Sequence, residues 1–273
     1  MSNSVTLPER MPSHSKVPKW ATEAFDSFLD HFDELRDVLH LSIHGISLIR
    51  GTPNTIRVLA EIKRNLDAED TQQSLKRAQA EAELAQQELD TGFPLLHAQG
   101  AISLWGALEA LIQTFLAKWL ANVPEAMNLK AIQELKVPLG EWEALDKDER
   151  HDLIVDLLER GLNATFKHGI SRFEAVLEIF GLSGGVDDDD RRTLFELQQI
   201  RNVLVHRRGI VDRRLVTACP WLDLQVGRRL TIDHKAYHRY ANGVDGYTAT
   251  LIKRVGDFFQ AGPGTGETSK VTT

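Results

Sequence analysis

The chain has 273 residues, of which 42% are hydrophobic and 26% charged, so it is long enough to bury one large or two modest cores. Its formal net charge of −7 argues against a protein that coats nucleic acid over its whole surface. The single cysteine, Cys219, excludes an internal disulfide framework and a cysteine-rich zinc site.

The N-terminal third is predicted to be a helical arm. Residues 1–18 are expected to form a flexible leader, and apolar side chains then recur at helical spacing over residues 20–49. A turn at residues 51–54 precedes a second long helical segment over residues 55–90. We therefore expect residues 19–91 to form a helical hairpin. It is either a rigid arm on the rest of the chain or a recognition surface for a partner.

The remainder is predicted to form one all-α domain over residues 93–260, a usual size for a compact unit. An apolar helix covers residues 101–112, and further helices are expected over residues 146–162, 169–180 and 234–260. Residues 261–273 are polar and glycine-rich and are expected to be disordered. The sequence has no apolar N-terminal leader and no run of about 18 apolar residues, so we expect a cytoplasmic protein without a membrane span.

The most informative helix is predicted to begin near Asp188. A Ser-Gly-Gly break precedes it, and four consecutive aspartates supply the negative charge that a helix N-terminus favours. Gly209 is the expected end, in a left-handed conformation. At about 100° per residue, Arg201 falls roughly 20° from Leu194, inside the apolar stripe, so its guanidinium needs a partner or a wet cleft. His206 lies one turn beyond Asn202, within reach of the arginine side chain.

These side-chain types suit metal-independent cleavage of RNA. Such cleavage needs a base for the ribose 2′-hydroxyl and an acid for the leaving 5′-oxygen, and histidine serves both roles near neutral pH. A fixed guanidinium holds phosphoryl oxygens where charge builds, so Arg201 is the candidate cation and His206 the candidate proton carrier. Asn202 is the candidate orienting group. The simpler alternative is that these cations only stabilise the C-terminus of the helix.

Basic residues continue past the helix end, in contrast to the acidic chain as a whole. They are candidates for binding the RNA backbone. The four are Arg207, Arg208, Arg213 and Arg214.

The run Arg201-Asn202-Val203-Leu204-Val205-His206, with the following Gly-Ile-Val-Asp, resembles the signature of HEPN domains. These are an all-α superfamily of dimeric ribonucleases and their inactive relatives. The apolar segment at 101–112, the helix at 172–182 and the ending at 226–260 are similar to the family's pattern. The resemblance implies an HEPN-like bundle after the N-terminal hairpin, an endoribonuclease, a homodimer with two facing motifs, and Glu109 as an orienting partner of Arg201.

Such ribonucleases serve as toxins, phage-defence effectors or stress nucleases, restrained by an antitoxin or a sensor protein. Two alternatives stay open. One is a non-catalytic HEPN-like module that dimerises or binds RNA, and the other is a helical immunity or antitoxin protein, whose acidic charge would suit a basic toxin.

Other motifs are interpreted as structural. The glycine-rich segment 262–268 resembles a nucleotide-binding loop but has Glu267 where the lysine should stand, and no strand precedes it. The pairs His40 with His44 and His234 with His238 lack further ligands at metal-site spacing. We therefore expect neither a metal nor a cofactor.

Overall fold

The computed structural model describes residues 17–163 and 168–261, and every named element in these ranges is a helix. The all-α fold class expected from the sequence is therefore confirmed. Within these ranges the extended backbone is limited to one isolated bridge between Ile210 and Arg229. The glycine-rich segment 262–268, most of the expected leader and most of the expected tail lie outside the described residues.

The α-helices in chain order are α1 (Lys19–Ile49), α2 (Thr52–Lys63), α3 (Glu69–Thr91), α4 (Pro94–Asn122), α5 (Lys130–Gln133), α6 (Leu139–Ala144), α7 (Lys147–Asn163), α8 (Ser171–Ile179), α9 (Asp188–His206), α10 (Arg213–Ala218) and α11 (His234–Ala261). Two 3-10 turns, η1 (Pro124–Asn128) and η2 (Pro220–Leu222), connect them. The helices expected over 20–49, 146–162, 169–180 and 234–260 are confirmed as α1, α7, α8 and α11.

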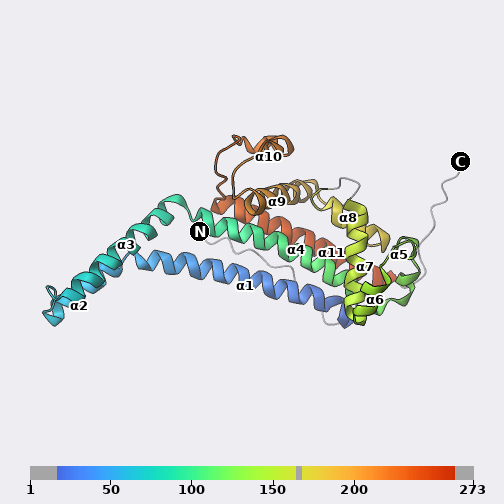
Figure 1. Ribbon diagram of the computed structural model, residues 1–273, viewed down its shortest axis with the longest axis horizontal. Helices are drawn as coiled ribbons and strands as arrows, with labels where there is room; N and C mark the ends of the chain where they lie inside the picture. Colours follow the sequence, from blue (N-terminus) through green and yellow to red (C-terminus); the bar gives the residue numbers. More distant parts are fainter. Residues whose placement is uncertain (1–16, 164–167, 262–273) are drawn as a thin grey trace.

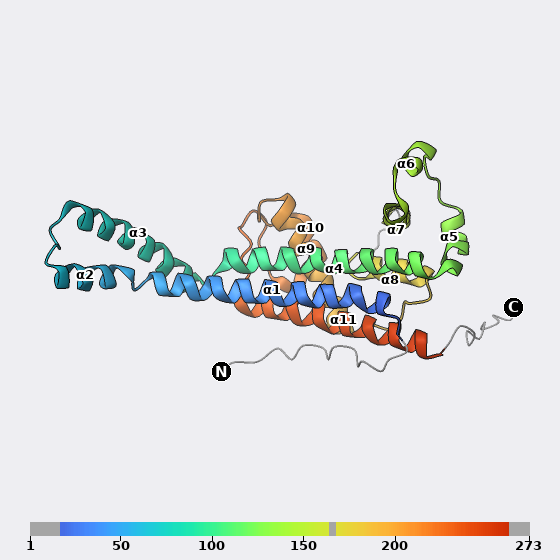
Figure 2. The same cartoon turned by 90° about the horizontal axis from the view of Figure 1, so that it is seen from below.

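The body of the protein is organised around α4. Figure 2 shows α1, α4 and α11 running side by side, and α4 also packs against α7 and α9. Because neighbours cover α4 on several sides, its buried residues are not confined to one stripe, and they include Trp105 and Trp119. Among the described helices, α4 is long and apolar enough to cross a membrane, but half of its most apolar window is buried inside the structure. It is the core helix of the bundle.

The N-terminal arm differs from the expected pair of helices. The N-terminal half of α1 belongs to the body, where Phe25 and Phe28 are buried, while α2 and α3 project beyond it (Figure 1). The expectation of a single helix over residues 55–90 is wrong. Arg64 adopts a left-handed φ of 53°, and α2 ends there. Asn65 and other polar residues that favour turns follow, and α3 then begins at Glu69, where acidic side chains suit a helix N-terminus.

The arm carries many exposed apolar side chains. They are Val38, Leu41, Leu48, Ile49, Val58, Leu59, Ile62 and Leu84. We call this set the arm surface. Exposed apolar side chains that adjoin one another mark interaction sites, so the arm surface is a candidate surface for binding a partner.

Candidate functional site

Helix α9 positions the candidate site, and both of its ends follow the sequence signals. Asp187 caps the N-terminus by accepting hydrogen bonds from the amides of Asp189, at 2.9 Å, and Asp190. At the other end Gly209 has a φ of 73°, and its N–H donates to the carbonyl of Val203 at 3.1 Å. The expected start and stop of this helix are confirmed. The tight C-terminal turn fixes where the last helical residue, His206, lies.

Arg201, Asn202 and His206 lie together at this end of α9. Nη1 of Arg201 is 3.4 Å from Nε2 of His206 and 3.5 Å from Oδ1 of Asn202. The His206 side chain is exposed, whereas Leu194 and Leu197 on the preceding turns are fully buried. The Arg201 side chain is 27% exposed, so it lies at the edge of the apolar stripe, and its Nε is buried without a hydrogen-bond partner among the described residues.

A carboxylate from α4 approaches the same guanidinium. Nη2 of Arg201 lies 3.9 Å from Oε2 of Glu109, which is the partner that the sequence suggested. The other oxygen, Oε1, accepts a hydrogen bond from Arg172 of α8 at 2.9 Å. Arg172 also lies 3.6 Å from Glu159 of α7. Four helices therefore contribute to one chain of charged groups that ends at Arg201 and His206.

Burial and the neighbouring charges determine the pKa of Glu159 in this network. Burial raises the pKa of Glu159, Arg172 opposes that effect, and the neighbouring carboxylates of Glu109 and Asp156 raise the pKa further. Two acidic groups thus compete for the charge of Arg172. The sequence did not single out Arg172 or Glu159, because nothing in their local spacing indicates that α7 and α8 pack beside α4.

The contacts of Arg201 are long. All three distances are at or beyond the limit of a good hydrogen bond, and a strong guanidinium–carboxylate pair would be about 2.8 Å. Its Nη groups therefore form no close ion pair within the described part of the chain. Such a guanidinium is able to bind an anion without first breaking a strong internal contact.

The four arginines that follow α9 are all exposed. Arg207 lies 3.6 Å from Asp212, so part of its charge is already balanced, while Arg213 and Arg214 occupy the first turn of α10. Figure 1 shows α10 projecting beside α9. Arg208 adopts a left-handed φ of 55°, an unusual conformation for a residue that is not glycine.

The structure adds two further cations that the sequence did not indicate. The N–H of Val211 donates to the carbonyl of Arg228 at 2.9 Å, and Ile210 bridges with Arg229. Both arginines are exposed, so this pairing brings a second basic pair beside the segment that follows α9. Only the turn at Gly227, with a φ of 85°, could have signalled that the chain doubles back here.

The remaining features are structural. Cys219 is buried, and burial followed by the charge of Glu196 raises the pKa of its thiol to about 12, which makes it unreactive. No group of three or more His, Cys, Asp and Glu side chains within the described ranges is arranged to hold a metal ion. His234 and His238 stack edge to face, with ring centroids 4.1 Å apart.

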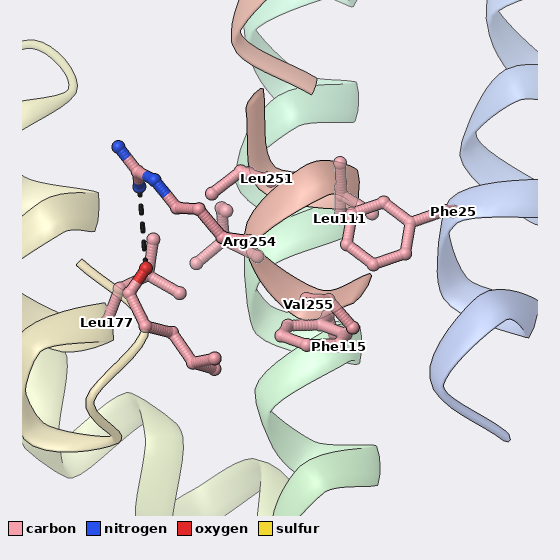
Figure 3. Close-up of a pocket in the computed structure, with 9 residues that line it drawn as sticks. Phe25, Leu111, Phe115, Leu177, Leu251, Arg254 and Val255 are labelled. Carbon is pink, nitrogen blue, oxygen red and sulfur yellow. Dashed lines mark hydrogen bonds between the residues drawn. The ribbon is translucent and has the colours of Figure 1, made fainter. Parts of the chain in front are cut away.

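An apolar cavity among α1, α4, α8 and α11 is too small for a substrate. Figure 3 shows Phe25, Phe115 and Val255 around it, and its volume is about 10 Å³, room for one water at most. The guanidinium of Arg254 at its edge points away and bonds Glu174 at 2.9 Å. The cavity is a packing defect of the core.

Searches against family models, curated proteins and solved structures return no match for this chain.

Proposed function

We propose that the protein is a metal-independent endoribonuclease whose site is formed by Arg201, Asn202 and His206. His206 removes the proton of a ribose 2′-hydroxyl, and the resulting oxygen attacks the adjacent phosphorus. The bond to the 5′-oxygen breaks, and that oxygen leaves with a proton. The products are a 2′,3′-cyclic phosphate and a 5′-hydroxyl. Arg201 neutralises the charge that develops on the phosphoryl oxygens, and Asn202 orients one of the reacting groups.

The observation that carries this proposal is the loose coordination of Arg201 beside an exposed histidine. A guanidinium that served only to stabilise the fold would be expected to form a short ion pair, because partial burial of an unpaired charge costs free energy. Here the nearest carboxylate, that of Glu109, is 3.9 Å away and is itself held by Arg172. The arrangement supports binding of an anion that contacts both Arg201 and His206.

The resemblance to HEPN domains supports the same site and adds a homodimer to the proposal. One protomer supplies one histidine, whereas the reaction needs both a base and an acid. A two-fold axis beside the C-terminus of α9 would bring a second His206 and a second Arg201 into the same cleft. A toxin, phage-defence or stress effector, restrained in the cytoplasm by an antitoxin or a sensor, is the biological role that this proposal favours.

The direct test is cleavage of single-stranded RNA by the full-length protein with EDTA present. We expect cleavage and products with a 2′,3′-cyclic phosphate or 3′-phosphate, because every role is assigned to a side chain. A requirement for added magnesium, or 3′-hydroxyl products, would contradict the mechanism. Induced expression of the wild type beside His206→Ala then tests the toxin role, since only the wild type should arrest growth.

The arm surface favours a second candidate, a binding module without catalysis. Ile62 is 72% exposed and Leu41 66%, and both lie on the arm. Polar replacement of Leu59 and Ile62 separates the two candidates. If the arm surface is the functional surface, these changes abolish dimerisation or RNA binding. In that case the purified wild type cleaves no RNA. If the protein is a ribonuclease, cleavage is present in the wild type and depends on His206.

A further inference from the structure

A concave pocket lies along α9, at the end opposite to His206. It is an open pocket of about 530 Å³, within the range of about 300–1,000 Å³ that small-molecule sites occupy. Its floor includes two aromatic rings, those of Phe195 and Trp221, whose centroids are 6.4 Å apart. Trp221 is 40% exposed, which is unusual for so large an apolar side chain.

The exposed tryptophan is held in place by a buried charge. Nε1 of Trp221 donates a hydrogen bond of 2.7 Å to Glu196, which is 1% exposed. Arg239 and Tyr240 of α11 also donate to this carboxylate. Burial alone would raise the pKa of Glu196, but these hydrogen bonds outweigh burial and lower it. A buried carboxylate is costly unless it is fully paired, so its use to fix an exposed ring indicates a preorganised surface.

Cations surround this aromatic surface. The guanidinium carbon of Arg192 lies 4.4 Å from the centroid of the Trp221 ring, and Arg191 lines the same pocket. Neither arginine forms an ion pair with a carboxylate in the described ranges, although Asp188 also lines the pocket. The hydroxyl of Ser171 and the imidazole of His168 provide further polar groups. An exposed tryptophan ring, a partly buried phenylalanine ring and arginines without an ion pair are the combination that binds an unpaired base and its phosphate.

The pocket shares one face of α9 with two residues of the proposed active site, Asn202 and His206. At about 100° per residue, Phe195 lies roughly 20° from both Asn202 and His206. His206 follows Phe195 by eleven residues of helix, a rise of roughly 16 Å along the axis. About five stacked nucleotides, or fewer in an extended strand, would span it at 3.4 Å per nucleotide. A single RNA strand lying along α9 would therefore contact both sites.

We propose that the pocket lined by Arg192, Phe195 and Trp221 binds one unpaired nucleotide of single-stranded RNA, a few positions away from the bond that His206 cleaves. The base stacks on the aromatic rings, and the adjacent phosphate pairs with Arg191 and Arg192. The pocket thus selects unpaired RNA and sets the distance from the bound base to the cut. This inference rests on the proposed ribonuclease function, because it takes RNA as the ligand.

The experiment measures binding of a short fluorescent single-stranded RNA to full-length protein that carries His206→Ala, so that the RNA stays intact. In that background Trp221→Leu should weaken binding by about 5- to 150-fold, the scale of one lost base stack. Trp221→Phe should retain most of the affinity, since it keeps an aromatic face. Arg192→Gln should reduce the slope of log affinity against log salt by about one unit. Arg160→Gln, which removes an exposed arginine of α7, is the matched control and should change neither quantity.

Abasic RNAs locate the bound nucleotide. Single bases are removed in turn. At one position the losses of binding free energy caused by the missing base and by Trp221→Leu should not be additive, because both changes remove the same stack. Equal affinities of the Trp221→Leu and Trp221→Phe proteins, or additive effects at every position, would overturn the pocket while leaving the nuclease intact. RNA that does not bind the parent protein at all would overturn the proposed function as well.

Competition by free mononucleotides is the last part of the experiment. They should compete only weakly, because a single nucleotide lacks the contacts with Arg201 and with the basic residues after α9. Tight binding of a mononucleotide that leaves RNA affinity unchanged would instead identify a free nucleotide as the ligand and overturn the proposal. Circular dichroism of each variant checks folding. Because Arg192 is exposed, Arg192→Gln keeps the test valid if Trp221→Leu fails to fold.

Discussion

Arg172 donates a hydrogen bond to Glu109 at 2.9 Å, so the carboxylate nearest to Arg201 is held by a different arginine from a different helix. Glu109 remains 3.9 Å from Arg201 and leaves that guanidinium available. Arg172 therefore acts on the candidate site indirectly, by limiting how closely Glu109 approaches. This relationship makes Glu109 a positioning residue in the proposed mechanism.

Glu109→Gln should lower kcat by about 10-fold with a small change in KM, because Arg201 loses a charge that orients it while its own contact with RNA remains. The change should cost about 1 kcal/mol of stability, since Gln still accepts from Arg172 and Glu159 remains nearby. Steady-state cleavage and urea unfolding measure the two effects. Glu178→Gln, an exposed change on α8, is the control. An unchanged kcat would show that Glu109 serves the fold alone.

His206→Ala should reduce the cleavage rate by at least about 100-fold with folding retained, the usual scale for a positioned acid or base. His206 is exposed, so its removal leaves no cavity. His44→Ala, at another exposed histidine, should leave the rate unchanged. Full activity of the His206→Ala protein would show that His206 takes no part in the cleavage.

Arg201→Ala should cause a similar loss of rate, and Arg201→Lys should not restore it, because an ammonium cannot reproduce the two parallel hydrogen bonds of a guanidinium. Single-turnover cleavage at saturating RNA separates this effect from binding. Recovery of the wild-type rate by lysine would mean that the site needs only a positive charge.

The basic residues after α9 should control affinity more than chemistry. Replacing all four with Gln should flatten the salt dependence of RNA binding by up to about four units, and somewhat less if Arg207 stays paired with Asp212. Arg228→Gln with Arg229→Gln should remove up to about two more. The reaction at saturating RNA should survive. In the control, the exposed arm cations Arg57, Lys63, Lys76 and Arg77 are replaced with Gln. An equal loss of salt dependence in the control would show that RNA binds to positive charge in general and not to a defined site.

The active species should be a dimer, since one protomer supplies one histidine for a reaction that needs a base and an acid. Specific activity should fall on dilution in step with dissociation measured by sedimentation. Mixing wild-type protein with an excess of His206→Ala protein tests whether sites are shared, because a hybrid dimer holds a single His206 and activity should fall by more than the share of wild type alone accounts for. A monomer that cuts RNA at undiminished specific activity would contradict the dimer.

Stability should depend on pH through Asp245. Burial first, and then repulsion from Asp190 and Asp33, raise its pKa from 3.8 to about 6. Between about pH 4 and pH 6 the folded protein keeps a proton that the unfolded chain has lost, so stability falls as the pH rises through this window. Asp245→Asn removes this penalty and should stabilise the protein at pH 7 by roughly 1–2 kcal/mol, with little effect near pH 4.

Unfolding midpoints against pH, at one protein concentration, measure this difference. Asp257→Asn, an exposed change on the same helix, should shift stability by less than about 0.5 kcal/mol at either pH. Parallel pH profiles for the wild type and the Asp245→Asn protein would show that Asp245 ionises normally.

Local chemistry was enough to place α9 and the residues at its end. The four carboxylates at residues 187–190, leucines at helical spacing and a glycine free to adopt positive φ act within a few residues of chain, so the sequence predicts the start, the buried face and the stop. The same reasoning placed Asn202 and His206 within reach of Arg201. It missed the break at Arg64, because weak turn signals there compete with a long helical pattern.

Contacts between distant segments were decided by packing. The bond between Glu109 and Arg172 spans 63 residues, and that between Trp221 and Glu196 spans 25. Each requires helices or turns to meet at one angle and register, which depends on the shapes of all the side chains between them. The sequence could name Glu109 as a candidate. Only the folded chain could show that Arg172 holds it and that Trp221 lines a pocket on the same helix as His206.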